Sequence, residues 1–333
     1  MKKTLLPALL FCIISGSCKK NNNSNPDGPV VYLAGYQWDS VAGNDRSTVW
    51  KNGTALTNQM SGITNHYAYG IYVNGSDVYT TGFENQPSQW KCMVWKNSIL
   101  QYTLGTGYSY GNGIAVTGSD VLVTGGAYTQ SPLTYSAMLW KNQSGPATTL
   151  ASNGGSTLGT AIVLSGTDTY VAGYENNIGR IWKNGTSITL NNAAGFPISC
   201  VAVSGNNVYG AASNGNIIRY WINENHTDIN IPIGSSGVVT GIAIDGNDVY
   251  LSGWEYNGTV GIAKYWKNGN SVVLGDGIRS SRANAIAIHN KDIYVAGEVR
   301  GTGTVSDFAT LWKNGNPSTI GHKNSRAIAL TVK

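Results

Sequence analysis

The side chains best suited to binding chemistry are aromatic and charged residues that interrupt an otherwise repetitive sequence. They are Trp38, Asp39, Arg46, Trp90, Tyr110, Tyr128, Tyr135, Trp254, Tyr256, Arg282 and Arg300. The aromatic rings offer flat apolar surfaces with polar edges, and neighbouring arginines and carboxylates can hydrogen-bond a polar ligand. This combination suits a carbohydrate or a protein surface. We therefore predict that these residues form a ligand-binding face.

Residue patterns of known catalytic chemistry are missing from the sequence. It holds no Gly-x-Ser-x-Gly turn, no His-Glu-x-x-His pair and no glycine-rich phosphate loop. The four histidines, His66, His226, His289 and His322, have no metal-ligand spacing. We predict no catalytic residues, no metal and no cofactor, and favour a protein that is not an enzyme. The alternative is a polysaccharide hydrolase or lyase, which would need two carboxylates brought together near the centre of the fold.

A repeat of about 43 residues organises residues 30–332. Each unit runs from a small apolar strand through a turn, Val-Tyr-x-x-Gly, a variable stretch and Trp-Lys-Asn-Gly to a short Thr-rich strand. The tryptophan recurs at Trp50, Trp95, Trp140, Trp182, Trp221, Trp266 and Trp312. The repeat has the length of one four-stranded blade of a β-propeller. We letter its strands a to d in chain order.

The two ends of the repeat region complement each other. The first unit opens at strand b, Val30–Gly35, and the chain finishes with an unaccompanied strand a, Arg326–Val332. Pairing these two segments completes the first blade and removes the exposed edges of an open array. We predict an all-β, seven-bladed propeller with four-stranded blades over residues 30–332. A parallel β-solenoid is the alternative, but its repeats are usually shorter and its ends need not match.

The predicted binding residues share one face of this ring. Because consecutive strands run antiparallel, the a–b and c–d turns lie on one face and the b–c and d–a loops lie on the other. The turns are short and repetitive, whereas the b–c and d–a loops are long, variable and aromatic. Function on a repeat scaffold resides in variable loops. We call the two sides the turn face and the loop face, and predict binding on the loop face.

Residues that recur in every blade are expected to be structural, since they cannot mark a single site. The seven tryptophans should pack between adjacent blades. The turn aspartates, Asp77, Asp120, Asp168, Asp248 and Asp292, should cap their own turns. The lysines that follow six of the tryptophans should be solvated. The Asn-Gly pairs between strands c and d suit tight turns that need positive φ.

Composition and charge exclude several classes of protein. Gly supplies 43 of 333 residues and charged residues only 12%, which does not suit a helical bundle or coiled coil. The 41% apolar content argues against a disordered chain. Removal of residues 1–17 takes away two lysines and no acid, which lowers the net charge from +5 to +3. That charge is too small to suggest nucleic-acid binding. We expect a monomer.

The first segment has the layout of an export signal. Residues 1–17 combine a basic start, a short apolar run and small residues, too short for a spanning helix. The sequence Ser15-Gly16-Ser17-Cys18 resembles the lipobox of bacterial lipoproteins, although Ser15 stands where Leu is usual. The resemblance implies that Cys18 is acylated and holds the protein to a membrane, with residues 18–29 as a flexible tether. An ordinary cleaved signal is the alternative.

The repeats also resemble a known group. The Tyr-Val-Ala-Gly segments at 170–173 and 294–297 look like repeats of bacterial surface β-propellers of the YVTN type. Together with Trp-Lys-Asn-Gly, they look most like propeller-repeat lipoproteins of Gram-negative bacteria. The resemblance spans residues 30–332 and implies the propeller fold, with no catalytic set to carry over. It implies location in the cell envelope at the outer membrane, on the periplasmic or the surface side.

These observations lead to one functional hypothesis and two alternatives. The leading hypothesis is an exported, lipid-anchored and non-enzymatic binding module that meets glycans or an envelope protein through its b–c and d–a loops. The first alternative is the polysaccharide hydrolase or lyase with carboxylates near the axis. The second is a purely structural scaffold. Fold alone cannot choose among them, because propellers host enzymes, lectins and scaffolds alike.

Overall fold

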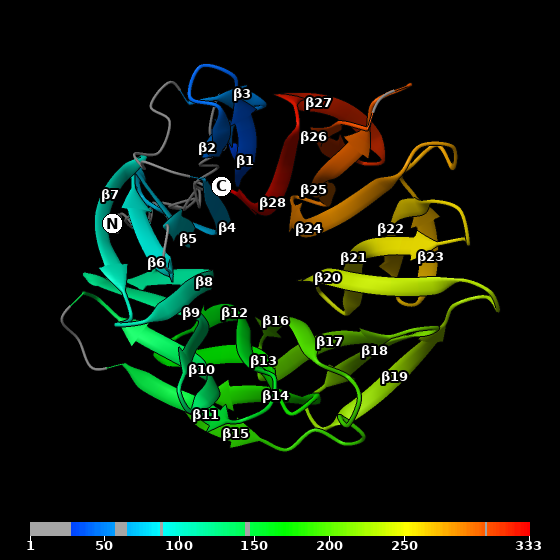
Figure 1. The fold of residues 1–333 in the computed structure, drawn as a ribbon. Helices are drawn as coiled ribbons and strands as arrows, with labels where there is room; N and C mark the ends of the chain where they lie inside the picture. The colour runs from blue at the N-terminus through cyan, green and yellow to red at the C-terminus, as the bar shows by residue number, and fades with distance from the viewer. Residues whose placement is uncertain (1–27, 57–64, 87–88, 144–146, 304) are drawn as a thin grey trace, which may run out of the picture.

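Seven four-stranded antiparallel sheets form a ring in the computed structural model, which describes residues 28–56, 65–86, 89–143, 147–303 and 305–333 (Figure 1). The predicted signal peptide, Cys18 and all of the tether except residues 28–29 lie outside the described residues. Within the described part, no helix is long and apolar enough to span a membrane. The seven-bladed propeller is confirmed, and the solenoid is wrong.

The strands of each blade follow in the order a, b, c, d. Blade 1 comprises β28 (Ser325–Val332), β1 (Val31–Asp39), β2 (Asn44–Lys51) and β3 (Thr54–Ala55); blade 2 comprises β4 (His66–Asn74), β5 (Asp77–Gln86), β6 (Gln89–Lys96) and β7 (Ile99–Leu104). Blade 3 comprises β8 (Tyr108–Thr117), β9 (Asp120–Gln130), β10 (Leu133–Lys141) and β11 (Thr148–Asn153); blade 4 comprises β12 (Thr157–Ser165), β13 (Asp168–Glu175), β14 (Ile178–Lys183) and β15 (Thr186–Ile188).

The remaining three blades repeat this order. Blade 5 comprises β16 (Ile198–Ser204), β17 (Asn207–Asn214), β18 (Ile217–Ile222) and β19 (Asn225–Asn230); blade 6 comprises β20 (Ser236–Asp245), β21 (Asp248–Tyr256), β22 (Gly261–Lys267) and β23 (Asn270–Val273). Blade 7 comprises β24 (Ser281–His289), β25 (Asp292–Arg300), β26 (Asp307–Lys313) and β27 (Asn316–Lys323).

The C-terminal strand closes the ring as the sequence predicts. β28 pairs antiparallel with β1, from Val31 opposite Val332 to Gln37 opposite Ser325. The backbone amide of Val30 donates to the carbonyl of Lys333 at 2.8 Å, and the amide of Lys333 donates to the carbonyl of Val30 at 3.0 Å. The red β28 lies beside the blue β1 in Figure 1. Both chain ends of the ring are therefore fixed in one sheet.

Every strand a carries a β-bulge at the same position. One residue in each has no partner in the a–b ladder: Tyr69, Asn112, Thr160, Ser199, Thr240, Asn284 and Ile328. The bulge explains the glycine of the Val-Tyr-x-x-Gly segment. At Gly82, an added Cβ would overlap the carbonyl oxygen of Tyr67, and the same overlap with a strand-a carbonyl arises at Gly35, Gly125, Gly173, Gly253 and Gly297. Only a glycine lets the two strands approach this closely.

Blade 5 departs from this rule, and its structure shows why. Ala212 takes the place of the glycine and pairs with Ile198, the residue at which β16 begins. The residue before Ile198 lies outside the ladder, so its carbonyl is not held against strand b. A Cβ is tolerated where the paired strand is shorter.

The tryptophans pack between blades as predicted. Trp95 of blade 2 is fully buried in one cluster with Ala34 and Val49 of blade 1. Each of the others likewise lies against the preceding blade: Trp50, Trp140, Trp182, Trp221, Trp266 and Trp312. These large rings fill the wedge between neighbouring sheets, so the core consists of seven similar seams.

The turn aspartates are structural, but their partners differ from those expected. Asp77 accepts from Asn97 Nδ2 at 2.9 Å and pairs with Lys96 Nζ at 2.7 Å, and Asn97 Oδ1 accepts from the Val78 amide at 2.8 Å. Asn97 has the positive φ, 51°, that this turn requires. Lys–Asp pairs recur in blades 3, 4, 6 and 7. The aspartates thus join the two turns of a blade instead of capping their own, and these lysines are paired.

We expect Gly82→Ala to lower the free energy of unfolding by about 1–3 kcal/mol, because strand a must move to admit the methyl group. Urea unfolding followed by tryptophan fluorescence measures the loss. The matched control is Gly154→Ala, where the nearest atom to the added Cβ, the Leu133 carbonyl oxygen, is 3.9 Å away, so stability should change by no more than about 0.5 kcal/mol. A loss at Gly82 no larger than that of the control would show that the carbonyl overlap does not explain the glycine.

Candidate functional site on the loop face

The bulged residues line the mouth of the central channel. All seven, one from each strand a, border a cavity of about 410 Å³. Four of them donate to a backbone carbonyl of the next blade: Asn112 Nδ2 to Gly159, Thr160 Oγ1 to Ile198, Thr240 Oγ1 to Ala283 and Asn284 Nδ2 to Ala327, at 2.7–2.9 Å. None of the seven is a carboxylate, so the bulges do not supply the axial acid pair of the hydrolase alternative.

Aromatic rings form a continuous row across blades 1, 2 and 3. The row, which we call the aromatic ladder, consists of Tyr36, Tyr67, Phe83, Trp90, Tyr108, Tyr128 and Tyr135. Its closest pair is Tyr108 and Tyr128, whose rings are stacked with centroids 4.4 Å apart. Trp90 meets both of these rings at 6.3 Å and remains 40% exposed. The ladder thus offers ring surface to solvent at Trp90, near the middle of the row.

A groove of about 700 Å³ lies beside the stacked tyrosines. Tyr108, Tyr128 and Thr129 line it at the loop face, and it extends along β10 past Ser136 to Gln143 in the c–d turn, at the turn face. No Asp, Glu, Lys, Arg or His is among the described residues that line it. The groove is therefore uncharged, with aromatic and hydroxyl groups together. Its volume lies within the range of ~300–1,000 Å³ that is usual for small-molecule sites.

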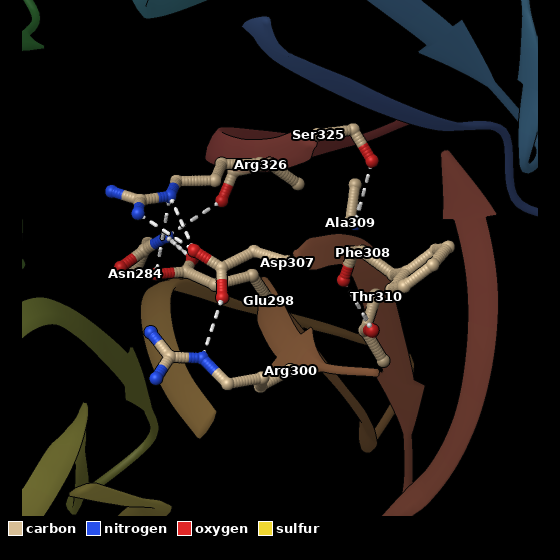
Figure 2. Close-up of polar contacts among 10 residues, drawn as sticks. Asn284, Glu298, Arg300, Asp307, Phe308, Ala309, Thr310, Ser325 and Arg326 are labelled. Carbon is tan, nitrogen blue, oxygen red and sulfur yellow. Dashed lines mark hydrogen bonds and ion pairs between the residues drawn. The ribbon is translucent and has the colours of Figure 1, made fainter. Parts of the chain in front are cut away.

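A charged cluster occupies the loop face where blades 7 and 1 meet (Figure 2). We call Arg282, Asn284, Glu298, Arg300, Asp307 and Arg326 the arginine cluster. Arg326 Nη2 and Nε lie 2.6 and 3.1 Å from Asp307 Oδ2, and Arg326 Nε lies 4.0 Å from Glu298 Oε1. Arg300 Nε lies 3.6 Å from Asp307 Oδ1. Asn284 donates to Glu298 Oε2 at 2.6 Å.

Glu298 is the buried acid of the cluster. Its side chain is 4% exposed, and this burial raises the pKa of Glu298 to about 7, against the opposing effects of Arg326, Asn284 and Arg282. The position is unusual within the repeat. Four residues after the tyrosine of strand b, blades 1, 2, 4 and 6 carry Tyr36, Phe83, Tyr174 and Trp254, whereas blade 7 carries a carboxyl group. Glu298 thus replaces an aromatic ring.

The two acids of the cluster border a cavity of only about 20 Å³, which is too small for a sugar ring. Glu298 and Asp307 both face the same guanidinium group, that of Arg326. In Figure 2 this group projects beside the two carboxyls, and dashed lines join it to both. A glycosidase needs its two carboxyls on opposite sides of the bond that it cleaves. This arrangement therefore fits a charge network that holds Arg326 in place better than an acid–base pair.

A second cavity, of about 320 Å³, lies next to the cluster. Tyr36, Trp38, Asp45, Asp307 and Arg326 line it. Trp38 is 44% exposed, so its ring forms an open wall of the cavity. The Tyr67 hydroxyl donates to Asp45 Oδ2 at 3.0 Å, which ties the aromatic ladder to this cavity.

The predicted binding residues divide among these features. Trp90, Tyr128 and Tyr135 belong to the aromatic ladder, Arg282 and Arg300 to the arginine cluster, and Trp38 to the adjoining cavity. The structure brings Trp254 to the cluster as well, because the Arg282 guanidinium lies 5.1 Å from its ring centroid.

Four other predicted residues have local partners. Asp39 accepts from the amides of Val41 and Ala42 and lies 3.5 Å from Arg46, which stabilises its own loop. Tyr256 donates to the Gly258 carbonyl within its loop at 3.0 Å. Tyr110 is half-buried, and burial raises the pKa of its hydroxyl to about 12.

Several residues of the site were not predicted. They are Tyr36, Tyr69, Phe83, Asn284, Glu298, Asp307 and Arg326. Glu298 could have been found by aligning the blades, since it breaks an aromatic position. Asn284 and Arg326 lie in β24 and β28, whose sequences resemble those of the other inner strands. Their role depends on the bulge and on contact with a neighbouring blade. In the described part of the chain, no three His, Cys, Asp or Glu residues gather to hold a metal ion.

Comparisons with known proteins identify the fold and no family. No family model matches the chain, and no curated protein matches it. A putative 6-phosphogluconolactonase from Bacteroides uniformis ATCC 8492 aligns with a TM-score of 0.50 at 14% identity, over 92% of this chain and 99% of that one. The computationally designed protein Ika8 aligns with a TM-score of 0.47 at 15% identity, over 80% and 90% of the two chains. At such low identity, the likeness concerns the fold alone.

We expect Glu298→Gln to change how stability depends on pH. The pKa of Glu298 is raised above its unfolded value of 4.5, so folding favours the proton, and the wild type loses stability as pH rises from about 4.5 to about 7, with no further loss above that. A glutamine does not titrate. The variant should therefore gain roughly 2–3 kcal/mol relative to the wild type between pH 5 and pH 8, measured by urea unfolding at each pH. Glu224→Gln, at an exposed turn position, should give no such trend, and a flat difference for Glu298→Gln would contradict the assignment.

Proposed function

We propose that the protein is a non-enzymatic binding module that binds a glycan on its loop face, along the aromatic ladder and the adjoining groove. The observation that carries the proposal is the stacked pair Tyr108 and Tyr128, with Trp90 against both, beside an uncharged groove of about 700 Å³. Sugar rings have apolar faces that pack on aromatic rings and hydroxyl groups that hydrogen-bond to amides and hydroxyls.

The composition of the groove supports a glycan over a protein partner. Protein interfaces of standard size bury about 800 Å² on each side and use a broad apolar centre with a polar rim. The groove combines aromatic, hydroxyl and amide groups with a few aliphatic ones such as Leu104 and Met138. A single extended chain of sugars fits such a groove better than a folded partner does.

We further propose that the protein is exported and anchored by lipid at Cys18. The support is the sequence Ser15-Gly16-Ser17-Cys18 after an apolar run. The first strand of the ring begins at Val31, so the segment from residue 18 to residue 29 separates the ring from the anchor. When extended, such a segment reaches about 40 Å. The ring can therefore bind ligands away from the membrane surface.

The glycan proposal predicts that binding depends on the ladder. A glycan array of the chain from residue 19 onward, followed by calorimetric titration of the best-binding saccharide, measures this dependence. Tyr128→Ala should weaken binding about tenfold or more, because it removes a ring surface from the groove wall. Trp90→Ala should have a similar effect, because its ring packs against both stacked tyrosines and offers exposed ring surface beside them.

The control for this experiment is Tyr265→Ala, a half-buried tyrosine of β22 outside the ladder. It should leave saccharide affinity unchanged. Equal losses in all three variants would point to a general effect on folding, and no saccharide binding by the wild type would overturn the glycan proposal in favour of a protein partner or a scaffold.

The anchor proposal predicts that Cys18→Ser abolishes acylation. Expression of the full chain in a Gram-negative host with radiolabelled palmitate should label the wild type in the membrane fraction, whereas the variant should be unlabelled and released from that fraction. Cys92→Ser is the control, since Cys92 is a buried free cysteine of the ring. Labelled Cys18→Ser protein would refute the anchor.

A further inference from the structure

The arginine cluster carries more positive charge than its own acids balance. Three guanidinium groups, those of Arg282, Arg300 and Arg326, line one small cavity together with only two acids, Asp307 and Glu298, which both pair with Arg326. The second acid is Glu298, and burial raises its pKa to about 7, so it is largely uncharged in mildly acidic solution. In this part of the loop face, three arginines therefore accompany two acids, whereas a Lys–Asp pair of the turn face joins one cation to one acid.

The unused hydrogen-bond donors of the cluster point toward one place. Arg300 reaches Asp307 only through Nε, and its two terminal nitrogens have no hydrogen-bond partner among the described residues. Figure 2 shows the guanidinium groups of Arg300 and Arg326 on either side of Asp307 and directed to the same side of the cluster. Arg282, Arg300 and Arg326 also line one small cavity, of about 20 Å³, which is room for an oxygen atom of water size.

The geometry points to a carboxylate-binding site at the arginine cluster, and we infer that the glycan bound on the loop face is acidic, with a uronic acid residue held by Arg282 and Arg300. This inference rests on the proposed glycan function. A carboxylate presents two oxygens in a plane, which matches the fork of a guanidinium group. Arg282 is already held in place by the Trp254 ring, so little of its freedom is lost when it binds.

A carboxylate fits this site better than a phosphate does. Asp307 and Asp45 border the adjoining cavity, and they would repel a phosphate dianion more strongly than a monoanion. The same two acids can accept hydrogen bonds from sugar hydroxyls, and Trp38 provides an exposed ring for the sugar face. These side chains together suit an acidic sugar.

The aromatic ladder connects this site to the groove. Tyr36 lines the same cavity as Asp307 and Arg326, and its ring contacts Tyr67 at 4.8 Å. Tyr67 contacts Phe83 at 5.1 Å, and Phe83 contacts Trp90 at 5.7 Å. An extended saccharide that follows the ladder has neutral sugars in the groove and its acidic residue at the cluster.

The test compares matched saccharides by titration calorimetry at pH 6. The probes are trigalacturonic acid, its methyl ester, which lacks the charge, and glucose 6-phosphate. The wild type should bind the acid at least tenfold more tightly than the ester. Arg282→Gln and Arg300→Gln should each weaken binding of the acid about tenfold and leave the ester unchanged. The control is Arg279→Gln, an exposed arginine paired with Asp276 outside the cluster, which should change neither.

A pH series adds a measurement that would not change if Glu298 had a purely structural role. Binding of the acid by the wild type should weaken from pH 6 to pH 8 as Glu298 ionises, and this trend should vanish in Glu298→Gln. The groups that face Glu298 are Arg282 and Asn284 on β24, Asp307 on β26, Arg326 on β28 and Tyr36 on β1. Burial raises the pKa of the Tyr36 hydroxyl to about 12, so among these groups Glu298 accounts for the trend.

The outcomes separate this inference from the proposed function. Equal binding of acid and ester, or preference for glucose 6-phosphate, would overturn the acidic-glycan inference and leave a glycan-binding module. An equal loss for Arg279→Gln would also overturn it, because the effect would then be one of general surface charge. Failure of every saccharide, charged or neutral, would overturn both proposals together.

Discussion

The close approach of strand b to a bulged strand a is the constraint on which the other features of this propeller depend. A carbonyl oxygen of strand a occupies the space where a Cβ of strand b would lie, so glycine stands there in six blades. The bulge turns one extra side chain into the channel from each blade. Four of these side chains hydrogen-bond to the next blade, so one local irregularity both shapes the channel and ties the ring together.

The two faces of the ring differ because the turns and the inter-blade contacts repeat in the blades, whereas the loops do not. On the turn face, asparagines with positive φ and Lys–Asp pairs join the tight turns, and the tryptophans below them fill the wedges between sheets. Each exposed ion pair adds little stability by itself, but the buried seams hold all seven blades in one geometry. The loops of the opposite face are then free to differ in length and chemistry, because the fold does not depend on them.

The loop face is chemically uneven. Its aromatic ladder and groove, over blades 1 to 3, are uncharged, whereas the junction of blades 7 and 1 holds three arginines around two acids. That junction is also where the ring closes, since Arg326 comes from β28 and Glu298 from β25. The last strand of the chain thus completes a sheet and supplies the central charge of the cluster.

The architecture could be predicted from the sequence alone, because the length of the repeat, the seven tryptophans and the matching ends are local patterns that admit one closed ring. The sequence also identified the loop face and several of its residues, including Trp90, Tyr128, Arg282 and Arg300. Which of these residues lie next to one another depends on the tertiary structure. Asp39 and Tyr256 serve their own loops, while Glu298, Asp307 and Arg326 meet across two blades. The physical reason is that repeat patterns arise from contacts within a blade, whereas the arrangement of the candidate site depends on contacts between blades and on the burial that they create.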